Sequence, residues 1–264
     1  MDNKEIFGVD ALIYSDNGER VEAGTTEDWD QWVSATRTRN YVLGDPVLDW
    51  LHLFGVANGF SMDTELPKYD KRTDFTEFIF AQGALFEERV VSLLRDKASM
   101  IDIGTSPGDA RNIGKARDTV LAMEEGVPII NQGVLFNPED MTYGIPDLLV
   151  RSDILNQIIP GSLSEEVSRI GASGIKSTGW HYRVVDIKFT TLKLQKGGEL
   201  GNRDSAPAYK CQLYVYNQAL GRILGYQPDS SFLLGRGWIE SKDSRGDQCL
   251  ERLATVTQSG AIAN

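Results

Sequence analysis

Two aspartates placed inside apolar segments constrain this chain more than any other feature of its sequence. Asp147 stands in Gly-Ile-Pro-Asp-Leu-Leu-Val, and Asp186 stands in Tyr-Arg-Val-Val-Asp-Ile-Lys. Such runs of aliphatic and β-branched residues predict buried strands, where a carboxylate is costly unless a partner neutralises it. Side chains two residues apart in a strand share a face, so Lys188 is expected beside Asp186, with Ile187 on the opposite face toward a core. Two buried acids and one ammonium group together indicate a cation site with a positioned lysine.

The length and composition are those of an ordinary globular protein. With 264 residues, 41% of them hydrophobic and 25% charged, the chain is long enough for a sizeable core in one large domain or two small ones. The net charge of −11 argues against a broad surface that coats nucleic acid, because such surfaces are normally basic. It does not exclude a local basic groove, and a bound divalent ion would reverse the field at an acidic site.

Several classes of site and location are disfavoured by what the sequence lacks. Cys211 and Cys249 show no pairing pattern, which gives no support to a disulfide framework, a thiolate zinc site or an iron–sulfur cluster. His52 and His181 are too few for a histidine-based metal centre. No apolar run approaches the length of a membrane span and the first residues are no signal peptide, so we expect a soluble, intracellular protein without a membrane partner.

Helix and strand signals along the middle of the chain predict an α/β fold. Thr73-Asp74 is expected to cap a long helix over 75–97, and Gly225 to end a second helix over 209–224. On the first of these helices Glu87 falls at the margin of the apolar stripe, whereas Glu88 fits a position that faces solvent. Strands are expected near 100–103, 132–136, 144–150, 182–190 and 232–239.

Three regions are expected along the chain. Residues 1–74 form a mostly helical N-terminal cap or accessory region, 75–240 form the core, and 241–264 form a polar tail without a closing element. That tail leaves open a further domain in a longer protein. In the cap, the apolar residues between Val47 and Phe54 recur at helical spacing, which favours packing in a core over a ligand site.

Four motifs occur in a characteristic order. They are Gly83-Ala-Leu-Phe-Glu87, Gly144-Ile-Pro-Asp147, Asp186-Ile-Lys188 and Gln212-Leu-Tyr-Val-Tyr216. Asp-x-Lys alone is common by chance, and a solvated salt bridge at a strand end usually explains it. In this order, each on a suitable element, the motifs resemble the PD-(D/E)xK nuclease superfamily and, more narrowly, its RecB-like branch, over roughly 82–224. The resemblance implies a mixed central β-sheet flanked by helices, which is a restriction-endonuclease-like core.

The resemblance also implies a Mg²⁺- or Mn²⁺-dependent deoxyribonuclease. Asp147, Asp186, Glu87 and the backbone carbonyl of Ile187 are then expected to bind the metal, and Lys188 to position the attacking water. Hard oxygen ligands suit these ions. Hydrolysis of a phosphodiester requires that the anionic phosphate oxygens be neutralised and a water be made nucleophilic, which such ions achieve.

Contacts with nucleic acid are expected from the segment and the helix that follow the Asp186 strand. Gln212 and Tyr216 share a helix face, and the resemblance associates this pair with DNA contact and with ordering of the catalytic site. The structural alternative is a helix that packs Tyr216 and exposes Gln212. Cationic side chains nearby suit phosphate contacts, although each alone fits a solvated loop equally well: Lys193, Lys196, Arg203 and Lys210.

Two departures from the family bear on these expectations. Two cysteines cannot supply the four-cysteine iron–sulfur cluster of some RecB-like exonucleases, so none is expected. Glu87 stands where RecB-like helicase-nucleases place a histidine, although a carboxylate also suits a hard cation. The leading hypothesis is a nuclease of DNA repair or recombination that acts on single strands or duplex ends, with a helicase or other domain as partner. A non-catalytic DNA-binding or assembly module and a restriction-type endonuclease are the alternatives.

Overall fold

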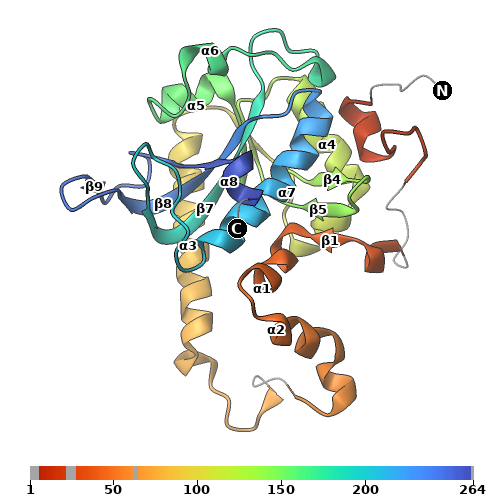
Figure 1. Cartoon of the computed structure of the whole chain (residues 1–264), viewed down its shortest axis with the longest axis vertical. Coiled ribbons are helices and arrows are strands. Elements are labelled where there is room, and N and C mark those ends of the chain that lie inside the picture. The colour runs from red at the N-terminus through yellow and green to blue at the C-terminus, as the bar shows by residue number, and fades with distance from the viewer. Residues whose placement is uncertain (1–5, 22–27, 62–64, 263–264) are drawn as a thin grey trace.

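A seven-stranded mixed sheet lies at the centre of the molecule in the computed structural model, which describes residues 6–21, 28–61 and 65–262 (Figure 1). Its strand order is β10-β8-β7-β6-β3-β2, with β9 paired to β8, and a separate three-stranded sheet has the order β1-β5-β4. The strands are β1 (Val33–Ser34), β2 (Met100–Asp102), β3 (Ile129–Asn131), β4 (Leu135–Asn137), β5 (Thr142–Gly144), β6 (Leu148–Arg151), β7 (Tyr182–Lys193), β8 (Ser230–Ile239), β9 (Arg245–Gly246) and β10 (Ala254–Thr257).

Helices flank the large sheet, so the expectation of a mixed α/β fold is confirmed. They are α1 (Thr38–Val42), α2 (Pro46–Trp50), α3 (Phe75–Arg95), α4 (Ile113–Glu124), α5 (Ser152–Ile158), α6 (Glu165–Ser168), α7 (Ala206–Leu224) and α8 (Gln258–Ile262). None of the helices in the described part of the chain is long and apolar enough to cross a membrane.

The strands that carry the two aspartate motifs are adjacent, as predicted. β6 pairs with β7 in antiparallel register, with Leu148 opposite Val185, and β7 pairs in parallel with β8. Val185 and Ile187 pack in the core that includes residues of α3, whereas Val184 packs in the core that includes residues of α7. Because side chains alternate along a strand, Asp147 and Asp186 both belong to the face toward α7.

The two long helices follow the predicted signals. The Asp74 side chain accepts hydrogen bonds from the backbone N–H groups of Thr76 and Glu77, which caps α3. Gly225 ends α7 with a positive φ of 61°, a conformation that glycine adopts without steric cost. α7 begins at Ala206, three residues before the predicted start, with a proline in its first turn, where the missing N–H costs nothing.

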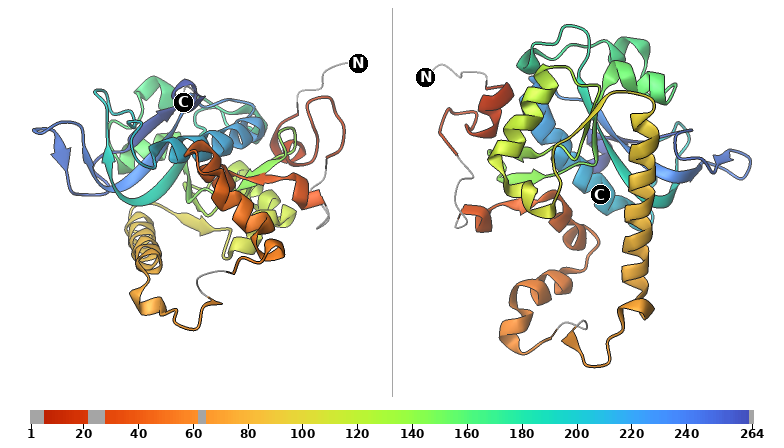
Figure 2. Two further views of the ribbon diagram at one scale, coloured as in Figure 1. Left: turned by 60° about the horizontal axis from the view of Figure 1, so that its bottom comes forward. Right: turned by 180° about the vertical axis from the view of Figure 1, so that it is seen from behind.

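The apolar residues between Val47 and Phe54 are not in the core, and this prediction was wrong. The segment is helical, but it belongs to an arm, residues 38–61, that projects from the rest of the molecule at the bottom of Figure 1. Trp50 is 43% exposed and Leu53 is 62% exposed. Periodicity predicted an apolar face correctly, but it does not specify whether a partner surface exists. Seen from behind, the N-terminal half of α3 also extends past the sheet (Figure 2).

The tail contains a closing element that the sequence did not indicate. β10 pairs antiparallel with β8, with Ala254 opposite Leu233, and so forms one edge of the large sheet. α8 then packs against α7. Ala254 and Val256 are buried, which shows that a short alternating Ala-Thr-Val-Thr run was sufficient for an edge strand.

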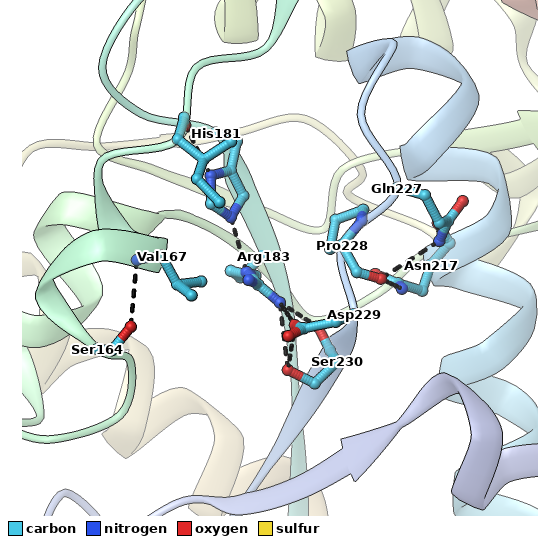
Figure 3. Close-up of polar contacts among 10 residues, drawn as sticks. Ser164, Val167, His181, Arg183, Asn217, Gln227, Pro228, Asp229 and Ser230 are labelled. Carbon is cyan, nitrogen blue, oxygen red and sulfur yellow. Dashed lines mark hydrogen bonds and ion pairs between the residues drawn. The ribbon is translucent and has the colours of Figure 1, made fainter.

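A polar network centred on the buried Arg183 joins the start of β7 to the start of β8, where Asp229 is exposed (Figure 3). The Arg183 side chain is fully buried; its Nε donates to His181 Nε2 at 2.8 Å, and its Nη1 donates to Asp229 Oδ1 at 2.8 Å. The same Nη1 also donates to the carbonyl oxygen of Ser230 at 2.8 Å. His181 is held on its other side, because Nδ1 lies 2.9 Å from the carbonyl oxygen of Ile170. The network fixes the starts of the two parallel strands relative to each other, three residues before Asp186.

Candidate functional site

The turn before β6 places Asp147 at the end of the sheet. Asp147 Oδ2 accepts a hydrogen bond from the backbone N–H of Ile187 at 2.6 Å, so this carboxylate binds the neighbouring strand directly. The preceding Gly144 lies against α7: a Cβ at that position would come within 2.4 Å of Tyr216 Cε1. The glycine in Gly-Ile-Pro-Asp therefore permits a close helix–strand contact that positions the aspartate.

Glu87 of α3 is joined to Asp147 through Gln132, a residue that was not predicted to belong to the site. Gln132 Nε2 donates to Glu87 Oε1 at 2.7 Å and to Asp147 Oδ1 at 3.3 Å, so one amide group joins both carboxylates. Gln132 follows β3 and has a positive φ of 53°, which is uncommon for a residue other than glycine. Its backbone N–H also donates to the Asp147 carbonyl at 2.9 Å. Nothing in the sequence around Gln132 indicated this role.

Asp186 and Lys188 form an ion pair on the face toward α7, as the strand periodicity predicted. Lys188 Nζ contacts Asp186 Oδ2, and the Asp186 side chain is 1% exposed. No hydrogen bond of acceptable geometry reaches Asp186 Oδ2, so this buried oxygen has its electrostatic partner but retains acceptor capacity. Burial lowers the pKa of Lys188, but the negative charges of Asp186 and Asp147 outweigh burial, and the pKa lies above its ordinary value. Lys188 is therefore an ammonium group at neutral pH.

The carboxylates influence one another electrostatically. Burial raises the pKa of Asp147 well above its ordinary value, and the charge of Asp186 raises it further. Burial also raises the pKa of Glu87; the hydrogen bond from Gln132 opposes this shift, whereas the charge of Asp186 adds to it. The site therefore concentrates negative charge in a place with little water, and added positive charge would stabilise it.

A pocket of about 660 Å³ opens above this cluster. Glu87 from α3 and Gln132 line one part of it, and Tyr216 from α7 lines another. The segment just before α1 forms a further wall through Ser34, Ala35 and Thr36. Asp147, Asp186 and Lys188 are not among the residues that line this pocket, and Asp186 is almost fully buried.

Gln212 and Tyr216 are hydrogen-bonded to each other, and the Tyr216 side chain is not exposed on the surface. Gln212 Nε2 donates to Tyr216 Oη at 3.0 Å, and Tyr216 Oη donates to the Ile145 carbonyl at 3.1 Å. Tyr216 is 2% exposed, so it holds the turn before Asp147 and offers little surface to a ligand. Burial and the charge of Asp186 both raise the pKa of this phenol. The structure thus brings both side chains to the site, with Tyr216 packed and Gln212 partly exposed.

The predicted phosphate contacts divide into two groups. Lys193, at the end of β7, is exposed, as are Lys196 and Arg203 on the segment between β7 and α7. Lys193 Nζ pairs with Asp204 Oδ2 at 2.7 Å. Lys210 is only 5% exposed, and its Nζ bonds to Asn202 Oδ1. Burial also lowers the pKa of Lys210. Lys210 therefore offers little surface to a phosphate, because its position on α7 turns the side chain toward the interior.

The cluster of Glu87, Asp147 and Asp186 is not preorganised to coordinate a metal ion. No group of three or more His, Cys, Asp or Glu side chains within the described ranges is placed to hold a metal ion. The Gln132 amide and the Lys188 ammonium instead contact Glu87, Asp147 and Asp186. The donor chemistry nevertheless suits a hard divalent cation, since carboxylate oxygens predominate and one oxygen of buried Asp186 accepts no hydrogen bond.

Comparisons with models of protein families, with curated proteins and with solved structures found no match to this chain.

Proposed function

We propose that this chain is a nuclease of the PD-(D/E)xK type, RecB-like, that hydrolyses phosphodiester bonds in DNA with the help of Mg²⁺ or Mn²⁺. The element order supports a restriction-endonuclease-like core: α3 is followed by the antiparallel strands β3, β6 and β7, and then by α7 and the parallel strand β8. β2, which pairs in parallel with β3, and the β4–β5 pair are additions to that arrangement.

One observation carries the proposal more than any other. Asp147 and Asp186 are 39 positions apart in the sequence, yet Asp147 directly precedes β6 and Asp186 lies on the adjacent strand β7. The backbone N–H of Ile187, the residue after Asp186, donates to Asp147 Oδ2 at 2.6 Å. Lys188 contacts Asp186 at the same place. Burying two like charges together has no benefit for the fold, which makes a ligand or a reaction the better explanation.

The metal would be held by Asp147, Asp186, Glu87 and the Ile187 carbonyl. When bound, it supplies neutralisation of the phosphate oxygens and activation of water. The charge of the three carboxylates, and the raised pKa values of Asp147 and Glu87, are what a divalent cation would offset.

Lys188 has a separate part in the proposed reaction. It remains protonated at neutral pH because Asp186 and Asp147 raise its pKa more than burial lowers it. An ammonium group in this place orients the attacking water by hydrogen bonding and stabilises negative charge that develops on the phosphate. Tyr216, through the Ile145 carbonyl, holds the turn that carries Asp147 and so positions the carboxylate.

The non-catalytic DNA-binding module is the second candidate, and one observation favours it. The carboxylates contact Gln132 and Lys188 in place of a preformed metal cage. In a metal-dependent nuclease the Gln132 and Lys188 side chains must break these contacts when a cation binds. In a non-catalytic binding module the contacts can remain.

Cleavage of labelled linear single-stranded, linear duplex and circular DNA distinguishes the candidates. We expect degradation of linear substrates with Mg²⁺ or Mn²⁺ and none with EDTA. Lys188→Ala removes one preorganised electrostatic group, and we expect a loss of about 10²–10³-fold in rate. Lys242→Ala, an exposed lysine beyond β8, is the matched control and should cleave as the parent does.

Discrete fragments from circular plasmid would favour the restriction-type alternative. DNA binding without cleavage in any metal would favour the non-catalytic module. Equal rates of cleavage by Lys188→Ala and the parent protein would refute the proposed catalytic role of Lys188.

A further inference from the structure

A second pocket, of about 280 Å³, lies beyond the catalytic segment of β7. Its walls come from the end of β7 (Thr190–Lys193), from the segment over 200–205, from the start of α7 and from Arg236 of β8. Nothing in the four motifs points to this pocket, and Arg236 was not among the residues predicted to contact nucleic acid.

The pocket carries an excess of positive charge on an acidic protein. Lys193, Arg203 and Arg236 line it together with one carboxylate, that of Asp204, whereas the whole chain has a net charge of −11. Asp204 pairs with Lys193 at 2.7 Å. Arg203 also acts electrostatically on Asp204 and lowers the pKa of that carboxyl group, but the ion pair of Asp204 within the described ranges is with Lys193, so the Arg203 and Arg236 guanidinium groups can each contact a ligand.

A fourth cation reaches the rim of the pocket from the arm. Arg39 Nη2 donates to Ser205 Oγ at 3.1 Å, and Ser205 lines the pocket. Cations from α1, β7, the following loop and β8 therefore converge, although they are far apart in the sequence. Such convergence would cost free energy through like-charge repulsion unless an anion binds there.

Arg236 is oriented so that it can bind an anion. Its guanidinium lies over the ring of Phe189, 5.2 Å from the centroid, and its Nε lies 3.4 Å from Thr191 Oγ1. These contacts leave the terminal nitrogens free, and a planar guanidinium binds two oxygens of one phosphate through them.

Tyr209 links the pocket to the proposed catalytic site. Tyr209 lines the pocket, and Lys188 Nζ lies 5.5 Å from the centroid of the same ring. Thr190 follows Lys188 by two residues, which is roughly 7 Å along a strand. A phosphate in the pocket would thus lie near the phosphate that reacts, on the same strand.

We propose that this pocket binds a phosphate group of the same nucleic-acid strand that enters the catalytic site, with Arg203 and Arg236 as the contacting residues. The inference rests on the proposed nuclease function, and it adds a binding position that sets the register of the strand. The phosphate is either a terminal monoester or an internal diester, because both present the oxygens that guanidinium groups recognise.

Binding measured without cleavage tests this inference. Fluorescence anisotropy in EDTA would follow short labelled single strands that carry a 5′-phosphate, a 3′-phosphate or neither. We expect Arg236→Ala and Arg203→Ala each to weaken binding about tenfold. Each should also reduce the slope of log affinity against log salt by about 0.7, the value for one phosphate contact on a single strand. Arg236→Lys keeps the charge but not the planar group, so the salt slope should persist while affinity falls.

The controls separate this inference from the proposed function. Arg117→Ala removes an exposed arginine from α4, away from the pocket, and should bind as the parent does. A loss confined to one terminally phosphorylated strand supports a terminal monoester, and an equal loss for all strands supports an internal diester. If the parent cleaves DNA but both arginine variants bind with unchanged affinity and salt slope, the pocket inference is wrong and the nuclease proposal stands. If the parent binds DNA through Arg203 and Arg236 but never cleaves it, the nuclease proposal is wrong and the phosphate-binding pocket stands.

Discussion

The buried contact between His181 and Arg183 makes the free energy of unfolding depend on pH in a specific way. Nδ1 of His181 faces the Ile170 carbonyl and Nε2 accepts from Arg183 Nε, so the ring has no free position for a second proton. Burial and the charge of Arg183 lower the pKa of His181 from 6.5 to about 4. In the unfolded chain the same side chain has a pKa of about 6.5.

The sign of the effect follows from proton binding. Between about pH 4 and pH 6.5 the unfolded chain binds a proton that the folded chain does not, so the unfolding free energy rises with pH. The contribution is complete above pH 6.5 and is lost as the pH falls toward 4. The difference between the folded and unfolded pKa values of His181 contributes about 3 kcal/mol to the free energy of unfolding at high pH. About 2 kcal/mol of this contribution is lost between pH 7 and pH 5.

Urea unfolding of the parent, His181→Gln and His52→Gln at pH 7 and pH 5 measures this contribution. The chain has two histidines, and His52 is exposed, so it provides a matched control. We expect the parent and His52→Gln to lose about 2 kcal/mol more than His181→Gln does on going from pH 7 to pH 5. Equal losses in all three proteins would show that His181 is not held neutral by Arg183, and the network would need another account.

Two further predictions concern the turn that carries Asp147. Gly144→Ala should destabilise the protein by about 1–3 kcal/mol and reduce cleavage, because a Cβ would come within 2.4 Å of Tyr216 Cε1. Thermal unfolding measures this loss of stability. Gly83→Ala in α3 is the control and should be neutral or stabilising, because a Cβ there meets nothing within 4 Å. Tyr216→Phe should cost about 1–3 kcal/mol, because the Ile145 carbonyl and the Gln212 amide lose their partner. A Tyr216→Phe protein that unfolds at the parent's temperature and cleaves at the parent's rate would contradict the positioning role of this hydroxyl.

Much of the central fold followed from local patterns. The adjacency of β6 and β7, the capped start of α3 and the glycine end of α7 each depend on short-range rules of strand alternation and helix capping. The pairing of Asp186 with Lys188 has the same origin, since residues two apart in a strand share a face.

What the sequence did not show depends on contacts between distant segments. Gln132 joins Glu87 to Asp147 across 45 and 15 positions, and no local pattern indicates such a bridge. The exposure of Trp50 reflects the outer part of the arm, which projects away from the sheet beyond α1, and the burial of Lys210 reflects how α7 is turned against its neighbours. The second pocket combines cations from four segments for the same reason.

A crystal structure of the protein soaked with Mn²⁺, measured by anomalous scattering, tests the central claim most directly. We predict a peak between Asp147 and Asp186, with Glu87 and the Ile187 carbonyl among its contacts and the Gln132 amide displaced. An Asp186→Asn crystal treated identically should lose the peak, whereas Asp243→Asn, which changes an exposed aspartate, should keep it. No peak at these carboxylates, or a peak that persists in Asp186→Asn, would contradict the metal-dependent account.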